Sequence, residues 1–134
     1  MENTFEQVRA GVHAYCKAIH TQQADDFFPL WAEDVETVLI APGGMYIGTE
    51  QIFRDFVTGS IQRAFERIDL IADEITCRSV TDDAVSVVFA YHTECIRRET
   101  GEPFGIAGLE TQMWVRRGSN WKLAHVHYSG SKKD

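Results

Sequence analysis

The second half of the chain constrains the fold most, because four stretches rich in β-forming residues follow one another with only short connections. These stretches lie near residues 68–80, 84–97, 104–117 and 121–129. The connections at 81–83, 99–102 and 118–120 are polar or contain glycine, and such short turns join antiparallel neighbours. We therefore predict a sheet of long antiparallel strands, with a bulge or sharp bend at Gly105 and Gly108.

The first half of the chain has the spacing of helices. Apolar residues three and four positions apart place one face of a first helix at Phe5, Val8, Val12, Tyr15 and Ile19. A capping box formed by Asn3 with Glu6, or by Thr4 with Gln7, would start this helix.

Three shorter elements follow the first helix. A second helix presents Phe27, Leu30 and Trp31, and Pro29 limits its length. Residues 35–40 favour a strand, and 41–44 a turn. A third helix starts at Thr49 and carries Ile52, Phe53 and Phe56 on its apolar face, with an interruption at Gly59-Ser60.

These elements predict an α+β fold in which N-terminal helices pack on a bent antiparallel sheet that forms a cone around a pocket. The length of 134 residues fits one core, so we expect a single domain over residues 1–130 and a flexible tail at 131–134.

Charge and composition exclude several classes of partner. The net charge of −7 argues against nucleic acid, which needs clustered basic residues. No apolar run approaches the roughly 20 residues of a membrane helix, and the N-terminus has no pattern of a signal peptide. The 3 cysteines have no close spacing and fit buried thiols in a reducing compartment. We expect a cytoplasmic protein with no cofactor, no membrane and no nucleic acid.

Alternation along the strands divides the sheet into two faces. One face would hold Ser86, Val88, Ala90, His92, Glu94, Glu110, Gln112, Trp114, Ala124, Val126 and Tyr128. The other would hold Val85, Val87, Phe89, Tyr91, Thr93, Thr111, Met113, Val115, Trp121, Leu123, His125 and His127. Both faces are substantially apolar, so we expect the helices to cover one and a second copy of the chain to cover the other.

The first face mixes apolar with polar side chains, as ligand pockets do. His92 is the first candidate for acid–base chemistry, because its ordinary pKa lies near neutrality, and Glu94 could orient it. Tyr15 could donate a hydrogen bond to an oxyanion. The alternatives are a histidine satisfied inside a polar cavity and a tyrosine of the core.

Other aromatic and polar side chains would hold the ligand. Gln112, Tyr128 and Trp114 share the pocket face, and Tyr46 could overhang its mouth. The alternative for Trp114 is core packing, and for Tyr46 it is a loop aromatic that covers the edge of the core. His125 and His127 share one strand face, but a zinc site wants three or four ligands, so we expect no metal.

Several motifs resemble a known group of proteins. Residues 110–117, Trp121 and 125–130 resemble the C-terminal end of the association domain of calcium/calmodulin-dependent protein kinase type II and of SnoaL-like proteins. In the front half, Tyr15, residues 30–34 and Gly48-Thr49 are similar to ketosteroid isomerase. All belong to the nuclear transport factor two-like superfamily, and the resemblance spans nearly the whole chain.

The resemblance implies a cone-shaped α+β barrel, a cystatin-like roll, that dimerises through its sheet. In ketosteroid isomerase a helix-one tyrosine and a protonated aspartate hold the oxyanion; Tyr15 matches the first, and Glu110 lies near the second. Leu39 stands where the isomerase has its general base. The arginines that line the kinase pocket are replaced by His92, Gln112 and Tyr128.

Three functions remain open at this point. The first is a dimeric protein that binds a small apolar or mixed-polarity molecule, with acid–base chemistry of the isomerase or cyclase type. The second is an association module without catalysis that forms a dimer or a higher homo-oligomer through the outer sheet face. The third is a relative that keeps the fold and a vestigial cavity, to which the missing base at Leu39 points.

Overall fold

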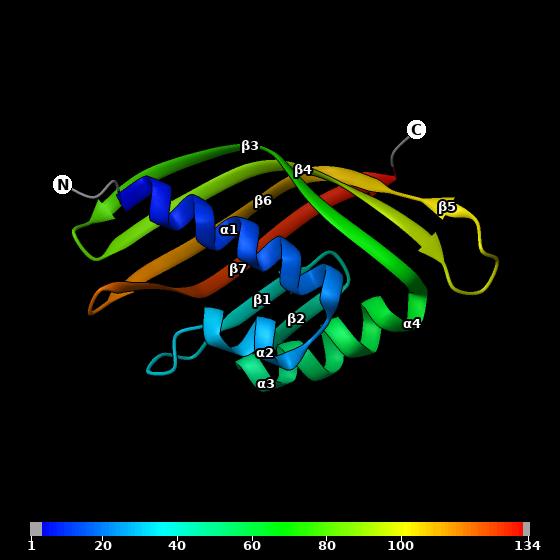
Figure 1. Cartoon of the computed structure of the whole chain (residues 1–134), viewed down its shortest axis with the longest axis horizontal. Coiled ribbons are helices and arrows are strands. Elements are labelled where there is room, and N and C mark those ends of the chain that lie inside the picture. The colour runs from blue at the N-terminus through cyan, green and yellow to red at the C-terminus, as the bar shows by residue number, and fades with distance from the viewer. Residues whose placement is uncertain (1–3, 133–134) are drawn as a thin grey trace.

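Helices come first and the long strands follow in this computed structural model, which describes residues 4–132 (Figure 1). The helical elements are α1 (Thr4–Thr21), α2 (Ala24–Phe27), the 3₁₀ helix η1 (Phe28–Leu30), α3 (Thr49–Gln51), the π-helix η2 (Ile52–Ile61) and α4 (Gln62–Ala64). The strands are β1 (Val38–Ala41), β2 (Gly44–Ile47), β3 (Phe65–Thr81), β4 (Ala84–Arg97), β5 (Pro103–Phe104), β6 (Ile106–Arg117) and β7 (Asn120–Lys132).

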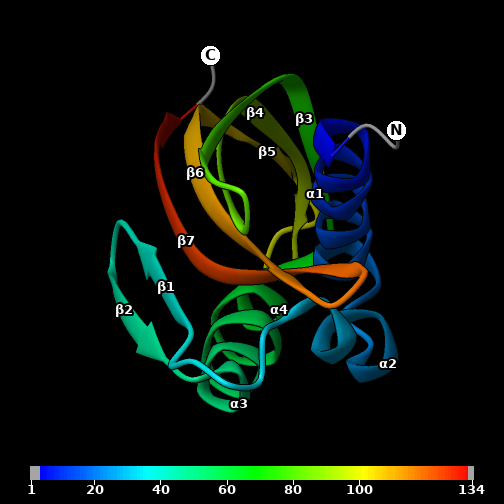
Figure 2. The same ribbon diagram turned by 90° about the vertical axis from the view of Figure 1, so that its left-hand side faces the viewer.

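The strands form one sheet in the order β2-β1-β7-β6-β4-β3, with β5 beside β4. The pairs β3–β4, β4–β6 and β6–β7 are antiparallel, as the short turns predict. Figure 2 shows these strands curving around an interior that α1 closes on one side and the segment from α3 to α4 closes below. The predicted α+β cone is confirmed.

The expectation of a purely antiparallel sheet is wrong at β1. This strand runs parallel to β7, with Val38 opposite His125 and Ile40 opposite His127. The strand β2, which the sequence did not predict, pairs antiparallel with β1 across the predicted turn at 41–44. Four residues with exposed Met45 and Ile47 give β2 little of the alternation that identifies a strand.

The predicted face of the first helix is buried. Val8, Val12, Tyr15 and Ile19 are each at most 2% exposed, because α1 lies along the inner side of the sheet. Asn3, one of the expected capping residues, lies outside the described residues. None of the helices within residues 4–132 is long and apolar enough to span a membrane.

The predicted interruption of the third helix at Gly59-Ser60 is wrong. Instead η2 continues through both residues as a π-helix, and the Thr58 hydroxyl donates to the carbonyl oxygens of Phe53 at 3.2 Å and Arg54 at 3.0 Å. A side chain at Gly59 would lie 2.9 Å from the Arg54 carbonyl oxygen, so glycine fits this wider helix. Residues five apart share a face of η2, which turns both Phe56 and Ile61 toward the interior.

Two boundaries differ in detail from the sequence-based expectations. Gly105 separates β5 from β6 and breaks the stretch predicted at 104–117. At Gly108 the pairing with β7 continues without a bulge. The strand β7 includes Ser131 and Lys132, so the predicted flexible tail is wrong for these two residues, and residues 133–134 lie outside the described part.

Candidate functional site

A cavity of about 90 Å³ lies inside the cone, between α1, η2 and the inner face of the sheet. Its walls are mainly aliphatic and aromatic, and five polar side chains interrupt them: Tyr15, Tyr91, Thr93, Glu110 and Tyr128. Pockets for drug-sized ligands are commonly about 300–1,000 Å³. The cavity is therefore suited to a molecule of few heavy atoms.

Glu110 is the one acidic side chain that lines this cavity in the described part of the chain. It is only 3% exposed, and its Oε2 accepts a hydrogen bond of 2.8 Å from Nε2 of Gln112. Burial raises the pKa of Glu110 from its ordinary 4.5 to about 8, while the hydrogen bond from Gln112 opposes the rise. Glu110 therefore holds its proton at neutral pH, but its pKa is close enough to neutrality for the proton to be exchanged.

Three tyrosine side chains line the same cavity and interact electrostatically with Glu110. Burial, followed by the negative charge of Glu110, raises the pKa of Tyr15 well above 10.0, and burial raises the pKa of Tyr91 to about 12. The pKa of Tyr128 is raised chiefly by burial as well. The phenols are thus neutral hydrogen-bond donors, and that of Tyr91 donates to the Ser129 carbonyl oxygen at 2.9 Å.

Strand register brings these groups together. Glu110 of β6 pairs with Phe89 of β4 on one side and with Tyr128 of β7 on the other. Residues directly opposite one another in an antiparallel sheet point to the same face. Tyr15 reaches the same space from the buried face of α1.

The model of the SnoaL-like domain matches residues 8–131 of this chain. The chain belongs to the SnoaL-like domain family. No curated protein matches the sequence.

Solved structures share the fold of this SnoaL-like domain. A nuclear transport factor 2-like superfamily protein from Salmonella enterica serovar Typhimurium has a TM-score of 0.87 and 27% identity, over 96% of this chain and 91% of that chain. The hexachlorocyclohexane dehydrochlorinase LinA-type3 from Novosphingobium barchaimii has a TM-score of 0.86 and 16% identity, over 97% of this chain and 88% of that chain. A protein with a cystatin-like fold from Caulobacter vibrioides has a TM-score of 0.76 and 17% identity, over 95% of this chain and 89% of that chain.

The predicted division of the sheet into two faces is wrong for β4 of the SnoaL-like domain. Tyr91 and Thr93, and not His92 and Glu94, share the inner face with Glu110, Gln112 and Tyr128. The break at Gly105 changes the parity between β4 and β6, so Phe89 rather than Ala90 pairs with Glu110. A bulge beside Met113 and Trp114 also turns both Leu123 and Val126 inward.

His92 and Glu94 lie together on the other face of the sheet. Nδ1 of His92 is 2.8 Å from Oδ2 of Asp73, and its Nε2 is 3.4 Å from Oε2 of Glu94. The structure therefore joins the predicted pair to each other but not to Tyr15, Gln112 and Tyr128.

The remaining predicted residues lie at or behind the inner cavity. Tyr15 and Tyr128 line it, and Gln112 holds Glu110 from behind. Tyr46 packs its ring on Phe56, 5.4 Å between centroids, and Phe56 packs in turn on Tyr128 at 6.0 Å. Trp114 is 1% exposed, and its Nε1 donates to Oε1 of Gln112 at 2.9 Å.

Tyr91 and Thr93 are polar cavity residues that reasoning from the sequence assigned to the opposite face. The sequence places Glu110 on the pocket face and near the position of an acidic residue of ketosteroid isomerase, but not among the candidate site residues. Its strongest signal is local: an acidic residue that alternates along one strand with Gln112 and Trp114, side chains that fill an interior.

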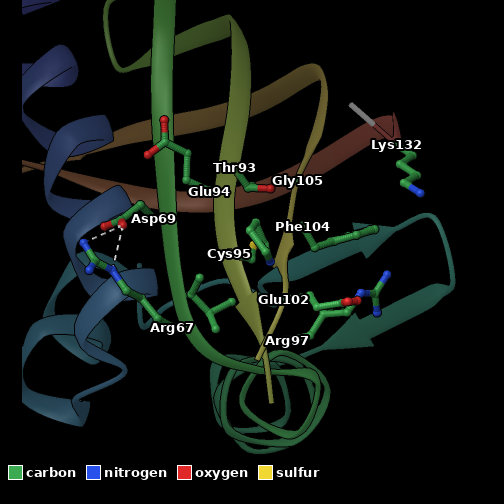
Figure 3. Close-up of a pocket in the computed structure, with 12 residues that line it drawn as sticks. Arg67, Asp69, Thr93, Glu94, Cys95, Arg97, Glu102, Phe104, Gly105 and Lys132 are labelled. Carbon is green, nitrogen blue, oxygen red and sulfur yellow. Dashed lines mark hydrogen bonds and ion pairs between the residues drawn. The ribbon is translucent and has the colours of Figure 1, made fainter. Parts of the chain in front are cut away.

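A second, open groove of about 650 Å³ lies at the bent end of the sheet (Figure 3). It shares Thr93, Cys95 and Phe104 with the inner cavity. Its rim carries both signs of charge: Arg67 pairs with Asp69 at 3.1 Å, and the guanidinium of Arg97 lies 4.0 Å from the ring centroid of Phe104. Glu94 lines this groove rather than the inner cavity.

Proposed function

We propose that this SnoaL-like domain binds a small, uncharged, mainly apolar molecule in the inner cavity and that Glu110 catalyses a proton-transfer reaction on it. The observation that carries the proposal is a buried carboxyl group, beside three phenols in an apolar cavity, whose pKa of about 8 lies near neutrality. A general acid or base works best when its pKa is close to the working pH.

Loss of water from a β-hydroxy ketone is the reaction that these groups complete by themselves. The phenols of Tyr15 and Tyr128 hold the ketone oxygen, and the carboxyl group of Glu110 gives its proton to the hydroxyl, which leaves as water. As this C–O bond breaks, the same carboxyl group takes the proton from the carbon next to the ketone, so the electrons of that C–H bond form the double bond and Glu110 regains its proton. The dehydrochlorinase with a similar fold also performs an elimination, as its name states.

The test uses 4-hydroxybutan-2-one, whose dehydration gives an enone that absorbs in the ultraviolet. Glu110→Gln keeps the size of the side chain but removes the exchangeable proton, so the rate should fall at least about 100-fold. The rate of the unchanged protein should also decline above pH 8, as Glu110 ionises and ceases to be an acid.

Glu74→Gln is the matched control, because Glu74 is exposed on β3 and lies outside the cavity. It should leave the rate unchanged. A Glu110→Gln variant as active as the unchanged protein would contradict the assignment of the proton transfer to Glu110.

The outer face of the sheet supports a homodimer as the assembled form. Val88 of β4 is 40% exposed and Leu109 of β6 is 56% exposed, on neighbouring strands of a face that none of the described helices covers. Apolar side chains grouped on a surface commonly mark interfaces, and a second copy offers a matching surface. The same observation favours the alternative function, an association module without catalysis.

Light scattering on the protein as it elutes from a size-exclusion column measures the mass of this assembly. We expect twice the mass of 15.2 kDa for the unchanged chain. The double variant Val88→Lys with Leu109→Lys should be a monomer, because the interface would bury two lysine ammonium groups away from water at a high cost in free energy. Val80→Lys, on an exposed apolar residue at the far end of β3, should remain dimeric. A monomeric unchanged chain would overturn the dimer, and a larger ring without turnover would favour the association module.

A further inference from the structure

Three buried side chains on the inner face of β6 form a hydrogen-bond series that ends at the cavity. Nε1 of Trp114 donates to Oε1 of Gln112 at 2.9 Å, and Nε2 of Gln112 donates to Oε2 of Glu110 at 2.8 Å. None of the three is more than 3% exposed. Water therefore does not compete with these contacts, and we call them the β6 hydrogen-bond chain.

The direction of each bond in this chain is fixed by its first member. An indole nitrogen can only donate, so the atom of Gln112 that faces Trp114 must be the amide oxygen. The NH₂ group of Gln112 is then the part that faces Glu110, and Oε2 of Glu110 must accept. A proton on Oε2 along this line would oppose the amide hydrogen.

We propose that the β6 hydrogen-bond chain places the acidic proton of Glu110 on Oε1, directed into the cavity, and so restricts the cavity to ligands that offer a hydrogen-bond-accepting oxygen. This inference rests on the proposed function, because it concerns the same carboxyl group. Within the described residues Oε1 has no hydrogen-bond partner, and Glu110 lines the cavity.

The other groups that face Glu110 strengthen the same selection. The phenols of Tyr15, Tyr91 and Tyr128 and the thiol of Cys16 interact electrostatically with it, and all are neutral at pH 7. Among the described residues that line the cavity there is no lysine or arginine to hold an anion. The cavity thus favours a neutral carbonyl or hydroxyl compound over a carboxylate or an ammonium ion.

Trp114 cannot turn away from Gln112, because α1 passes directly over its ring. A Cβ added at Gly11 would lie 2.7 Å from Cη2 of Trp114, which means that the helix backbone and the indole are already in close contact. Gly11 and Trp114 are therefore positioning residues: neither touches the ligand, and both act through Gln112.

Infrared spectroscopy can detect the proton directly. The difference spectrum between the unchanged protein and Glu110→Gln at pH 6 should contain one carboxylic acid C=O band. Cyclopentanone should shift this band, since its oxygen accepts the proton, whereas methylenecyclopentane, which has nearly the same shape, should not. In titrations followed by NMR, cyclopentanone should bind about tenfold more tightly than the hydrocarbon.

Trp114→Phe tests the relay while keeping an aromatic ring in place. Without the indole donor the amide of Gln112 is free to turn its oxygen toward Glu110, which favours the protonated carboxyl. We expect the pKa of Glu110 to rise by about one pH unit and the preference for cyclopentanone to fall below about threefold. Trp121→Phe, on a half-buried tryptophan of β7 outside the chain of bonds, should change neither. Gln112→Leu should also abolish the preference.

The inference would be overturned if Glu110 were ionised at pH 6, or if cyclopentanone did not shift the carboxylic acid band. It would also be overturned if Trp114→Phe changed neither the pKa of Glu110 nor the preference for cyclopentanone. These readouts need no turnover. A protein that shows all the expected shifts but leaves 4-hydroxybutan-2-one unchanged would contradict the proposed dehydration alone.

Discussion

Replacing Glu110 by glutamine is expected to stabilise the protein at pH 8.5 by roughly 4 kcal/mol, although it removes the candidate catalytic group. The pKa of this carboxyl group is about 8 in the folded chain and has its ordinary value of 4.5 when the chain unfolds. The folded state thus binds the proton more tightly. Below pH 4.5 both states hold it, and between pH 4.5 and pH 8 stability is lost because the folded chain must retain a proton that the unfolded chain releases.

Urea unfolding at pH 4.5, 6.5 and 8.5 measures this effect. Glutamine does not titrate, so the free energies of unfolding of the two proteins should be similar at pH 4.5 and diverge as the pH rises, with the variant above. Glu74→Gln, on an exposed strand residue, should follow the unchanged protein at every pH. Parallel curves for Glu110→Gln and the unchanged protein would mean that the folded structure does not retain the proton.

Gly108→Ala is expected to destabilise the protein by about 3 kcal/mol or more, at the upper end of the cost of overpacking. A Cβ at this position would overlap the carbonyl oxygen of Ser129 and lie 2.7 Å from Cα of Gly130. Both contacts are with the backbone of β7, which cannot rotate away as a side chain does. Relief requires β6 and β7 to separate where the Tyr91 hydroxyl bonds to Ser129.

Gly43→Ala is the control for this substitution. Nothing lies within 4 Å of a Cβ at Gly43, so the free energy of unfolding should change little. Urea titration of both variants gives the comparison. A Gly108→Ala protein as stable as the Gly43→Ala protein would show that the two strands can separate without cost.

The sequence predicts the antiparallel part of the fold well because short turns determine which strands are neighbours. Residues 84–97 form β4 with both boundaries as expected, and the turn that follows β3 lies at the predicted place. The parallel contact of β1 with β7 joins segments that are far apart in sequence, and no local pattern encodes it. The π-helix η2 was also missed, because glycine and serine more often end a helix than widen it.

The sequence predicts the location of some candidate site residues and not of others. Tyr15, Gln112 and Tyr128 lie at or against the inner cavity as expected, since each belongs to an element whose orientation is set by local periodicity. His92 and Glu94 were assigned to the wrong face of the sheet. Parity carries from one strand to the next only if the connection is regular, and the one between β4 and β6 contains β5 and the break at Gly105.

The position of β7 also has a consequence for biosynthesis. This strand is the last of those described, yet it lies between β1 and β6 and contributes Leu123 and Val126 to the core. While the ribosome is still making residues 120–132, the β1–β2 hairpin has no neighbour in the sheet, and β6 exposes an unpaired edge beside apolar side chains. A nascent chain at this stage carries the unpaired strand edge and exposed apolar surface that favour aggregation, and its sheet is completed only after β7 has emerged.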